Sequence, residues 1–261
     1  GHTVSPARAV VVGAGIAGAS VAAALARRGW QVRVLDAADS PAAGASGLPA
    51  GLFAPHVAPD DAPLSRLTRA GVRATRDALT HHLPHAHGTA WGADGVLERP
   101  LERVRQLPGV QGAGADGMAG GAPTDAMTDA LYEHSRAATA DHYAALNDAT
   151  LREPEAGALW HASGGWLKPA ELVRALLAQP GVRHDGGRQV ARIERISRVA
   201  GMAGATDTEA GGWRVLDAQG AVLAEAEFVV VAAAHATQAL CDAALPLQPL
   251  RGQVSMGRMP A

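Results

Sequence analysis

The sequence predicts an α/β protein in which a doubly wound, mainly parallel sheet is interrupted by an inserted antiparallel sheet. Three observations support this fold class. The chain opens with a strand, a helix and a second strand, it becomes rich in strand-like segments after residue 188, and one late segment, FVVVAAA at 228–234, is apolar throughout. A continuous apolar run is typical of a strand buried on both faces of a mainly parallel sheet.

The first elements follow from their residue types. RAVVV at 8–12 is a short β-branched run, and VAAALARR at 21–28 continues at helical spacing until Gly29, which ends the helix. QVRVL at 31–35 forms a second strand that ends at Asp36. A strand, a helix and a strand in this order are expected to start a parallel sheet.

A long amphipathic helix is predicted between residues 60 and 82, with Pro63 near its first turn. Its apolar or small residues recur in alternating steps of three and four, and its arginines, at 66, 69, 73 and 76, lie on the other faces. The apolar or small positions are Leu64, Leu67, Gly71, Ala74 and Ala78.

The later elements are shorter. Residues 109–128 are rich in Gly and Ala without periodicity, which predicts a mobile loop in this segment. WLKPAELVRALLAQPG at 166–181 predicts the end of a strand, a helix that begins at Pro169 and a Pro-Gly stop. Three or four strands follow, in QVARIERISRV at 189–199, GWRVLD at 212–217 and AVLAEAEFVVVAAA at 221–234. Arginines at 188, 192, 195 and 198 are expected on a solvated sheet face, and contact with RNA phosphate is the alternative.

The composition describes a globular chain of 261 residues, 48% hydrophobic and 18% charged, which fits one large domain or two intimate ones. A net charge of −2 provides no overall field that would attract DNA, RNA or an anionic membrane. The single cysteine, Cys241, cannot form an internal disulfide, so a cytoplasmic location is expected. Neither a membrane-spanning run nor a signal peptide is apparent, and the start Gly1-His2 is typical of a tag remnant or of a cut from a longer polypeptide.

A phosphate-binding turn is predicted at residues 13–18, where Gly13, Gly15 and Gly18 form G-x-G-x-x-G between the first strand and its helix. The first glycine permits a tight turn, the second lets the backbone approach a pyrophosphate, and the third lets the helix pack against the strand. The helix N-terminus, at Ile16 and Ala17, faces the anion.

Asp36 follows eighteen residues after the last glycine of this motif and is expected to accept hydrogen bonds from a ribose. An acid at this position disfavours a 2′-phosphorylated nucleotide but does not choose between NAD and FAD. An ordinary α/β turn beside a surface aspartate is the alternative interpretation.

A second glycine-rich turn, GASGLPAG at 44–51, follows the second strand. A nicotinamide-dependent enzyme has no obvious need for a second glycine-rich turn after the ribose-binding strand. FAD is a longer cofactor than NAD, so this turn favours FAD. With GASGLPAGLFAP at 44–55, SGGWLKPAELVRAL at 163–176 and PLRGQVS at 249–255, the sequence resembles the D-amino-acid-oxidase-like family of flavoproteins, most closely the oxidoreductase module of the bifunctional tRNA wobble-uridine enzymes. Leu48 stands where that family commonly has Asn, and a merely flexible loop is the alternative.

This resemblance implies a Rossmann-like FAD-binding domain interrupted by an antiparallel-sheet substrate domain. It implies FAD contacts at Gly13, Gly15, Ile16, Ala17, Gly18, Asp36, Gly44, Ala45, Ser46, Gly47, Ala50, Gly51 and Val190, the last through its backbone to the adenine. The implied domains are 1–90, the first part of the FAD-binding domain; 91–180, the first part of the substrate domain; 181–240, the second part of the FAD-binding domain; and 241–261, the start of a return to the substrate domain.

The implied reaction removes the carboxymethyl group from 5-carboxymethylaminomethyl-(2-thio)uridine at the tRNA wobble position. The partners would be modified tRNA and a methyltransferase module in the parent polypeptide. A glycine-oxidase-like or D-amino-acid-oxidase-like enzyme for a small amine and a non-catalytic nucleotide-binding fragment are the alternatives. The C-terminal part of the family fold is expected to be absent, which leaves the activity of this chain alone open.

The catalytic residues are not fixed by the sequence. Arg251 is a candidate for holding the substrate carboxylate, and a structural arginine is an equal alternative. His56 could face the flavin, although a solvated loop histidine is the preferred interpretation. No metal site is expected, because the histidines at 81, 82, 85 and 87 have no companion cysteine or carboxylate at ligand spacing.

Overall fold

The computed structural model describes residues 6–58, 60–99, 134–145, 158–197, 211–241, 245–250 and 252. The chain divides into two compact units, which are treated separately below. Unit 1 comprises residues 1–49 and 169–261, and unit 2 comprises residues 50–168. The family resemblance predicts the first two domain boundaries at residues 90 and 180. The loop predicted at 109–128 and Arg251 lie outside the described residues.

Unit 1 is built on a parallel sheet of four strands in the order β13-β1-β2-β9. The strands are β1 (Arg8–Val12), β2 (Gln31–Leu35), β9 (Val182–Asp185) and β13 (Phe228–Val231). The first strand–helix–strand prediction is confirmed, since β1 and β2 pair in parallel from Arg8 opposite Gln31 to Val12 opposite Leu35. All four strands therefore have their carboxyl ends at one edge of the sheet.

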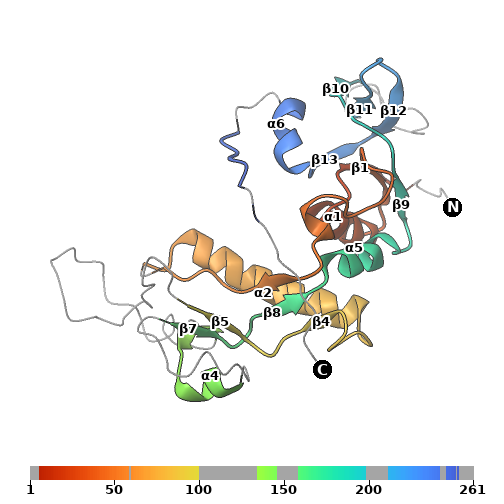
Figure 1. The fold of residues 1–261 in the computed structure, drawn as a ribbon. Coiled ribbons are helices and arrows are strands. Elements are labelled where there is room, and N and C mark those ends of the chain that lie inside the picture. The colour runs from red at the N-terminus through yellow and green to blue at the C-terminus, as the bar shows by residue number, and fades with distance from the viewer. Residues whose placement is uncertain are drawn as a thin grey trace. The chain divides into compact units, whose positions relative to one another are not determined.

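Different layers cover the two faces of this sheet (Figure 1). On one face lie α1 (Ile16–Ala26) and α5 (Pro169–Leu177), which pack against each other. On the other lies an antiparallel sheet of β10 (Arg192–Ile196), β11 (Gly212–Leu216) and β12 (Val222–Ala226). Val10 and Val12 of β1 pack against Val215 of this second sheet, whereas Val11 faces α1 near Gly18. Successive residues of β1 thus point to opposite faces of the parallel sheet and pack in the apolar layers on both sides.

Strand β13 differs from its prediction. It forms one edge of the parallel sheet within the described part of the chain, and its residues are half-buried, with Phe228 45% exposed. The expectation of a strand buried on both faces is therefore wrong for this structure. The apolar run reflects packing of Val229 against the core and ring contact between Phe228 and Trp30, and such a run does not by itself require burial on both faces.

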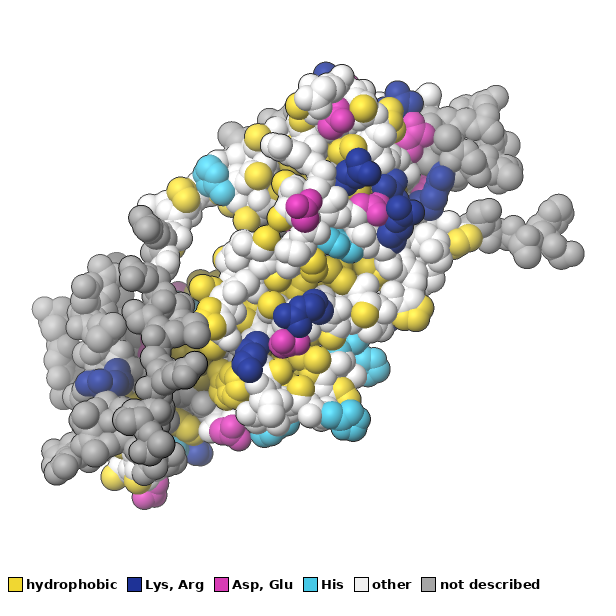
Figure 2. Space-filling model, turned by 45° about the vertical axis from the view of Figure 1, so that its right-hand side comes forward, with side chains coloured by type: hydrophobic (Ala, Val, Ile, Leu, Met, Phe, Trp, Pro, Cys, Tyr) yellow, Lys and Arg dark blue, Asp and Glu magenta, His cyan; other side chains and the backbone are white. Residues whose placement is uncertain are grey.

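Acidic side chains accompany most of the arginines on the described strands of unit 1. Asp185 binds both Arg33 and Arg183, Arg192 pairs with Glu194, and Arg214 pairs with Glu225. On the face shown in Figure 2, basic and acidic side chains are accordingly interspersed. These pairs give the strands a mixed rather than a purely basic surface.

The described residues of unit 2 form two small antiparallel sheets. The first has the order β3-β8-β4, from β3 (Gly51–Phe53), β4 (Trp91–Gly92) and β8 (Gly165–Leu167). The second has the order β5-β7-β6, from β5 (Val96–Glu98), β6 (Arg136–Ala137) and β7 (Leu159–His161). In the described part of this unit lie the helices α2 (Pro63–His82) and α4 (Ala140–Ala145).

Helix α2 is predicted correctly in position but packs through another face. Its buried residues are Ser65, Arg69, Val72 and Leu79, while Leu64 and Leu67 are 52% and 70% exposed. Both guanidinium nitrogens of Arg69 bind the Asp61 carboxylate, at 2.7 and 3.0 Å, and Ser65 Oγ lies 3.1 Å from His56 Nδ1. The buried face of α2 thus combines these satisfied polar groups with Val72 and Leu79, rather than the predicted apolar positions.

Candidate dinucleotide site

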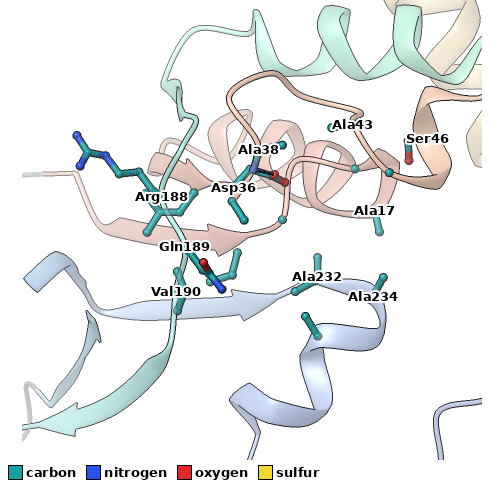
Figure 3. Close-up of a pocket in the computed structure, with 18 of the residues that line it drawn as sticks. Ala17, Asp36, Ala38, Ala43, Ser46, Arg188, Gln189, Val190, Ala232 and Ala234 are labelled. Atoms are coloured by element: carbon teal, nitrogen blue, oxygen red, sulfur yellow. Dashed lines mark hydrogen bonds between the residues drawn. The ribbon is translucent and has the colours of Figure 1, made fainter. Parts of the chain in front are cut away.

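A cavity of about 710 Å³ lies at the carboxyl-end edge of the parallel sheet of unit 1 (Figure 3). This volume is within the range of small-molecule and cofactor sites. Its walls come from the ends of β1, β2 and β13, the turn before α1, the loop after β2 and the segment between β9 and β10. From the predicted set, it is lined by Gly13, Gly15, Ile16, Ala17, Asp36, Gly44, Ala45, Ser46 and Val190.

Backbone contacts shape the glycine-rich turn at residues 13–18. Gly13 has φ +109°, and a Cβ there would overlap the carbonyl oxygen of Ala232. A Cβ on Gly18 would overlap the carbonyl oxygen of Gly13. Gly18 is buried and does not line the cavity, so its role here is to let α1 approach the turn.

Asp36 fixes the shape of this edge through its carboxylate. One oxygen accepts a hydrogen bond from the Ala14 N–H at 2.6 Å, and the other accepts from the Ala38 N–H at 2.8 Å. The carboxylate therefore ties the end of β2 to the turn after β1. Each oxygen keeps a further lone pair, so the same group can also accept hydrogen bonds from a ligand in the cavity.

Ser46 closes the N-terminus of α1 from a distant part of the chain. Its Oγ accepts a hydrogen bond from the Ile16 N–H at 3.0 Å, one of the first-turn groups that a helix leaves without an internal acceptor. The cap residue, Gly15, offers no side chain, and a Cβ there would lie 3.2 Å from Ser46 Oγ. The hydroxyl proton of Ser46 remains available as a donor.

The loop around Ser46 is held against the turn. The Ala42 N–H in this loop donates a hydrogen bond to the Ala14 carbonyl oxygen at 3.0 Å. Gly47 lies so close to Ala42 that a Cβ on it would overlap the Ala42 carbonyl oxygen. Gly47 does not line the cavity. Ala50 and Gly51 belong to unit 2, where Gly51 pairs with Leu167.

His56 also belongs to unit 2. Its backbone N–H donates to Thr68 Oγ1 at 2.9 Å, and its ring meets Ser65, so both ends of the residue have partners within the unit. No group of three or more His, Cys, Asp or Glu residues in the described ranges is arranged to hold a metal ion.

Several lining residues were not predicted from the sequence. They include Ala232, Ala233 and Ala234 after β13, together with Arg188 and Gln189 before β10. The parallel pairing of β13 with β1 brings the two strand ends together, and such a pairing has no local signature in the sequence. The small residues after FVVV are the one sequence signal that could have indicated a close approach there.

A chain of serine, histidine and glutamate occurs in unit 2. Ser135 Oγ lies 2.8 Å from His161 Nδ1, and His161 Nε2 lies 2.9 Å from Glu98 Oε2. Ser135 is 2% exposed and His161 is fully buried, so a substrate cannot reach the hydroxyl. The arrangement joins β5 and β7 to the residue before β6 and acts as a structural link.

Comparison with known proteins decides the family. Residues 8–260 match the family described as FAD dependent oxidoreductase. The chain belongs to this family. Its α/β architecture with separate parallel and antiparallel sheets is accordingly that of an FAD dependent oxidoreductase.

Two similar proteins are bifunctional enzymes of tRNA modification by name. The chain is 46% and 49% identical to the tRNA 5-methylaminomethyl-2-thiouridine biosynthesis bifunctional proteins MnmC of Polaromonas naphthalenivorans and Paracidovorax citrulli. Each match covers 97% of this chain and 36% of the relative, so the chain spans little more than a third of their length.

Solved structures of similar fold are more distant. Glycine oxidase from Geobacillus kaustophilus has a TM-score of 0.53 at 21% identity, over 90% of this chain and 57% of that one. L-Amino acid deaminase from Proteus myxofaciens has a TM-score of 0.54 at 18% identity, over 91% and 48%. Within the described residues, no helix is long and apolar enough to cross a membrane.

Proposed function

We propose that this chain binds FAD non-covalently in the unit 1 cavity and serves the oxidation of a secondary amine. Its substrate would be 5-carboxymethylaminomethyl-(2-thio)uridine at the wobble position of tRNA, which places the activity in the cytoplasm. The observation that carries the proposal is the identity of 46–49% to MnmC proteins over 97% of the chain, combined with the cavity at the predicted turn.

The residues at the cavity suit a dinucleotide. The N-terminus of α1 presents first-turn N–H groups and a positive dipole end to a pyrophosphate, and the absent side chain of Gly15 leaves room for it. Ser46 can donate its hydroxyl proton to a phosphate oxygen, Asp36 can accept from ribose hydroxyls, and Val190 can offer its peptide group to the base. Unit 1 is then a doubly wound Rossmann-like FAD domain, and unit 2 belongs to the substrate domain.

The chemistry balances for this substrate. FAD would supply the acceptor for the hydride removed from the carboxymethyl carbon next to the amine nitrogen. Loss of that hydride and of the N–H proton leaves a C=N bond, water adds to it, and glyoxylate departs from the aminomethyl-uridine. Oxygen then takes up two electrons and two protons to give peroxide. Arg251 and His56 remain the candidates for contact with the substrate, and modified tRNA and a methyltransferase module remain the proposed partners.

An oxidase for a small amine is the second candidate. The net charge is −2, and the described side chains on the face shown in Figure 2 have acidic groups between the basic ones, so these residues form no continuous basic surface for RNA. Peroxide and glyoxylate release should be measured with hypomodified tRNA, glycine, sarcosine and proline, using the longest natural polypeptide that contains these residues. Turnover with tRNA alone supports the proposal, turnover with a free amine supports the second candidate, and FAD binding without any turnover supports a non-catalytic module.

The cofactor site can be tested in the chain itself. Asp36→Ala removes the acceptor of two backbone N–H groups and of the ribose, and we expect FAD to bind roughly 10- to 100-fold more weakly. Asp36→Asn should also weaken binding, because its NH₂ group would face a backbone N–H at Ala14 or Ala38. Calorimetric titration with FAD and NAD measures this; wild-type chain that takes up NAD and not FAD would refute the assignment.

A further inference from the structure

Four polar side chains line the cavity within the described part of the chain, and three are already engaged or turned away. Asp36 and Ser46 accept backbone hydrogen bonds, and the guanidinium of Arg188 extends away from the cavity (Figure 3). The fourth, Gln189, has its carboxamide on the cavity side of the chain, and no hydrogen bond joins it to another described residue. It therefore offers a donor and an acceptor to a ligand.

The backbone holds this glutamine in place. The Arg188 N–H donates to the Asp36 carbonyl at 2.7 Å, and the Ala191 N–H donates to the Leu216 carbonyl at 2.8 Å. The two residues between these anchors make no backbone hydrogen bond within the described ranges. Their peptide groups and the Gln189 side chain thus form a short polar edge on an otherwise apolar wall.

We propose that Gln189 recognises the adenine base of the bound dinucleotide through its carboxamide. This inference rests on the proposed binding of FAD. Adenine presents an amino donor beside a ring-nitrogen acceptor, and a carboxamide matches both with its oxygen and its NH₂ group. Asp36 is the proposed ribose acceptor, and its backbone is bonded directly to the residue before Gln189. The base, one glycosidic bond from that ribose, falls beside the Gln189 edge.

The test measures dissociation constants for FAD and ADP in the full chain. Gln189→Ala and the similarly sized Gln189→Leu should weaken both ligands by the same factor, roughly three- to tenfold, because the lost hydrogen bonds are to the adenine that both share. Gln219→Ala is the matched control. Gln219 is an exposed glutamine between β11 and β12 of the same unit and does not line the cavity, so this variant should bind both ligands as the wild type does.

The outcomes separate this inference from the proposed function. Unchanged dissociation constants in both Gln189 variants overturn it, and so does a loss for FAD without a loss for ADP, since the contact would then not be to adenine. A wild-type chain that binds neither ligand overturns the proposed function and this inference with it. Unaltered far-ultraviolet circular dichroism of each variant shows that a measured loss does not reflect unfolding.

Discussion

Helix α1 of unit 1 and helix α2 of unit 2 bury different kinds of residue. The buried positions of α1 are Gly18, Ala19, Ala22 and Ala23, whereas those of α2 include Ser65 and Arg69. In α1 the absence of side-chain bulk lets the backbone come close to the neighbouring turn. In α2 the ion pair of Arg69 and Asp61 is buried, while Leu64 and Leu67 are exposed. The turn before α1 thus depends on small residues, whereas α2 buries an ion pair beside the apolar side chains of Val72 and Leu79.

The largest effect is expected from breaking the ion pair of α2. Arg69→Ala leaves the Asp61 carboxylate buried without its partner, and the loss of a buried partner typically costs about 3 to 5 kcal/mol. Denaturant unfolding measures this loss, and hydrogen exchange should assign it to unit 2. Arg66→Ala, on an exposed position of the same helix, is the control and should change stability by less than about 0.5 kcal/mol. Equal effects of the two substitutions would contradict the assigned role of the pair.

The close approach of α1 can be broken by one methyl group. Gly18→Ala places a Cβ on the Gly13 carbonyl oxygen, and since both partners are backbone, the helix or the turn must move. We expect a destabilisation of about 1 to 3 kcal/mol and a strong loss of FAD affinity, because the first-turn N–H groups shift with the helix. Fluorescence titration with FAD and denaturant unfolding are the measurements. A destabilised variant that binds FAD with normal affinity would mean that the turn at residues 13–18 does not bind FAD.

These two helices also show how far the sequence could predict the molecule. G-x-G-x-x-G and Asp36 have fixed spacing along the chain, so the turn, its strand and its helix could be predicted residue by residue. The position of α2 could be predicted from its period, but its buried face could not, because Arg69 binds Asp61, which lies eight residues earlier and just before the helix begins. The helical period of apolar and polar residues does not show which charged side chains form buried ion pairs.

The same limit applies to the cavity. Its glycine-rich wall is local in sequence, whereas Ala232 and Gln189 reach it only through the parallel pairing of β13 and β9 with the first two strands. Pairing of strands separated by more than 100 residues is decided by the packing of the whole sheet. Among the described strands β13 lies at the edge of the sheet, although its apolar run predicted a strand buried on both faces, and this position is a consequence of the same long-range order.

A more exposed ion pair should give a smaller effect. Arg33 and Arg183 lie opposite each other on β2 and β9, 40% and 73% exposed, and share Asp185. Burial of Asp185 opposes ionisation, but its hydrogen bonds to Arg33 and then Arg183, and the charges of both, lower its pKa below the usual value. Asp185→Asn should therefore cost about 1 kcal/mol at neutral pH.

The pH dependence of that cost follows from the direction of the pKa shift. Because the folded-state pKa of Asp185 lies below the unfolded-state value of about 4, the stabilisation is complete above about pH 4 and is lost as the pH falls through the folded-state pKa. Urea unfolding of wild type and Asp185→Asn across the acid range should show the two stabilities converging. A difference that stays constant down to the lowest pH would mean that the carboxylate charge contributes nothing.

The smallest effect is expected from the same substitution that should damage α1, made in α2. Gly71→Ala adds a Cβ that meets no atom within 4 Å, at an interior helix position on the exposed face. Alanine is favoured over glycine there by about 1 kcal/mol, so the variant should be stabilised by roughly 0.5 to 1 kcal/mol and should bind FAD normally. Thermal unfolding with and without FAD measures both quantities. Because Gly18→Ala and Gly71→Ala add the same atoms to the same kind of element, opposite signs would show that backbone approach distinguishes the two helices. Destabilisation by Gly71→Ala would instead mean that the exposed face of α2 with Leu64 and Leu67 packs against another part of the protein in solution.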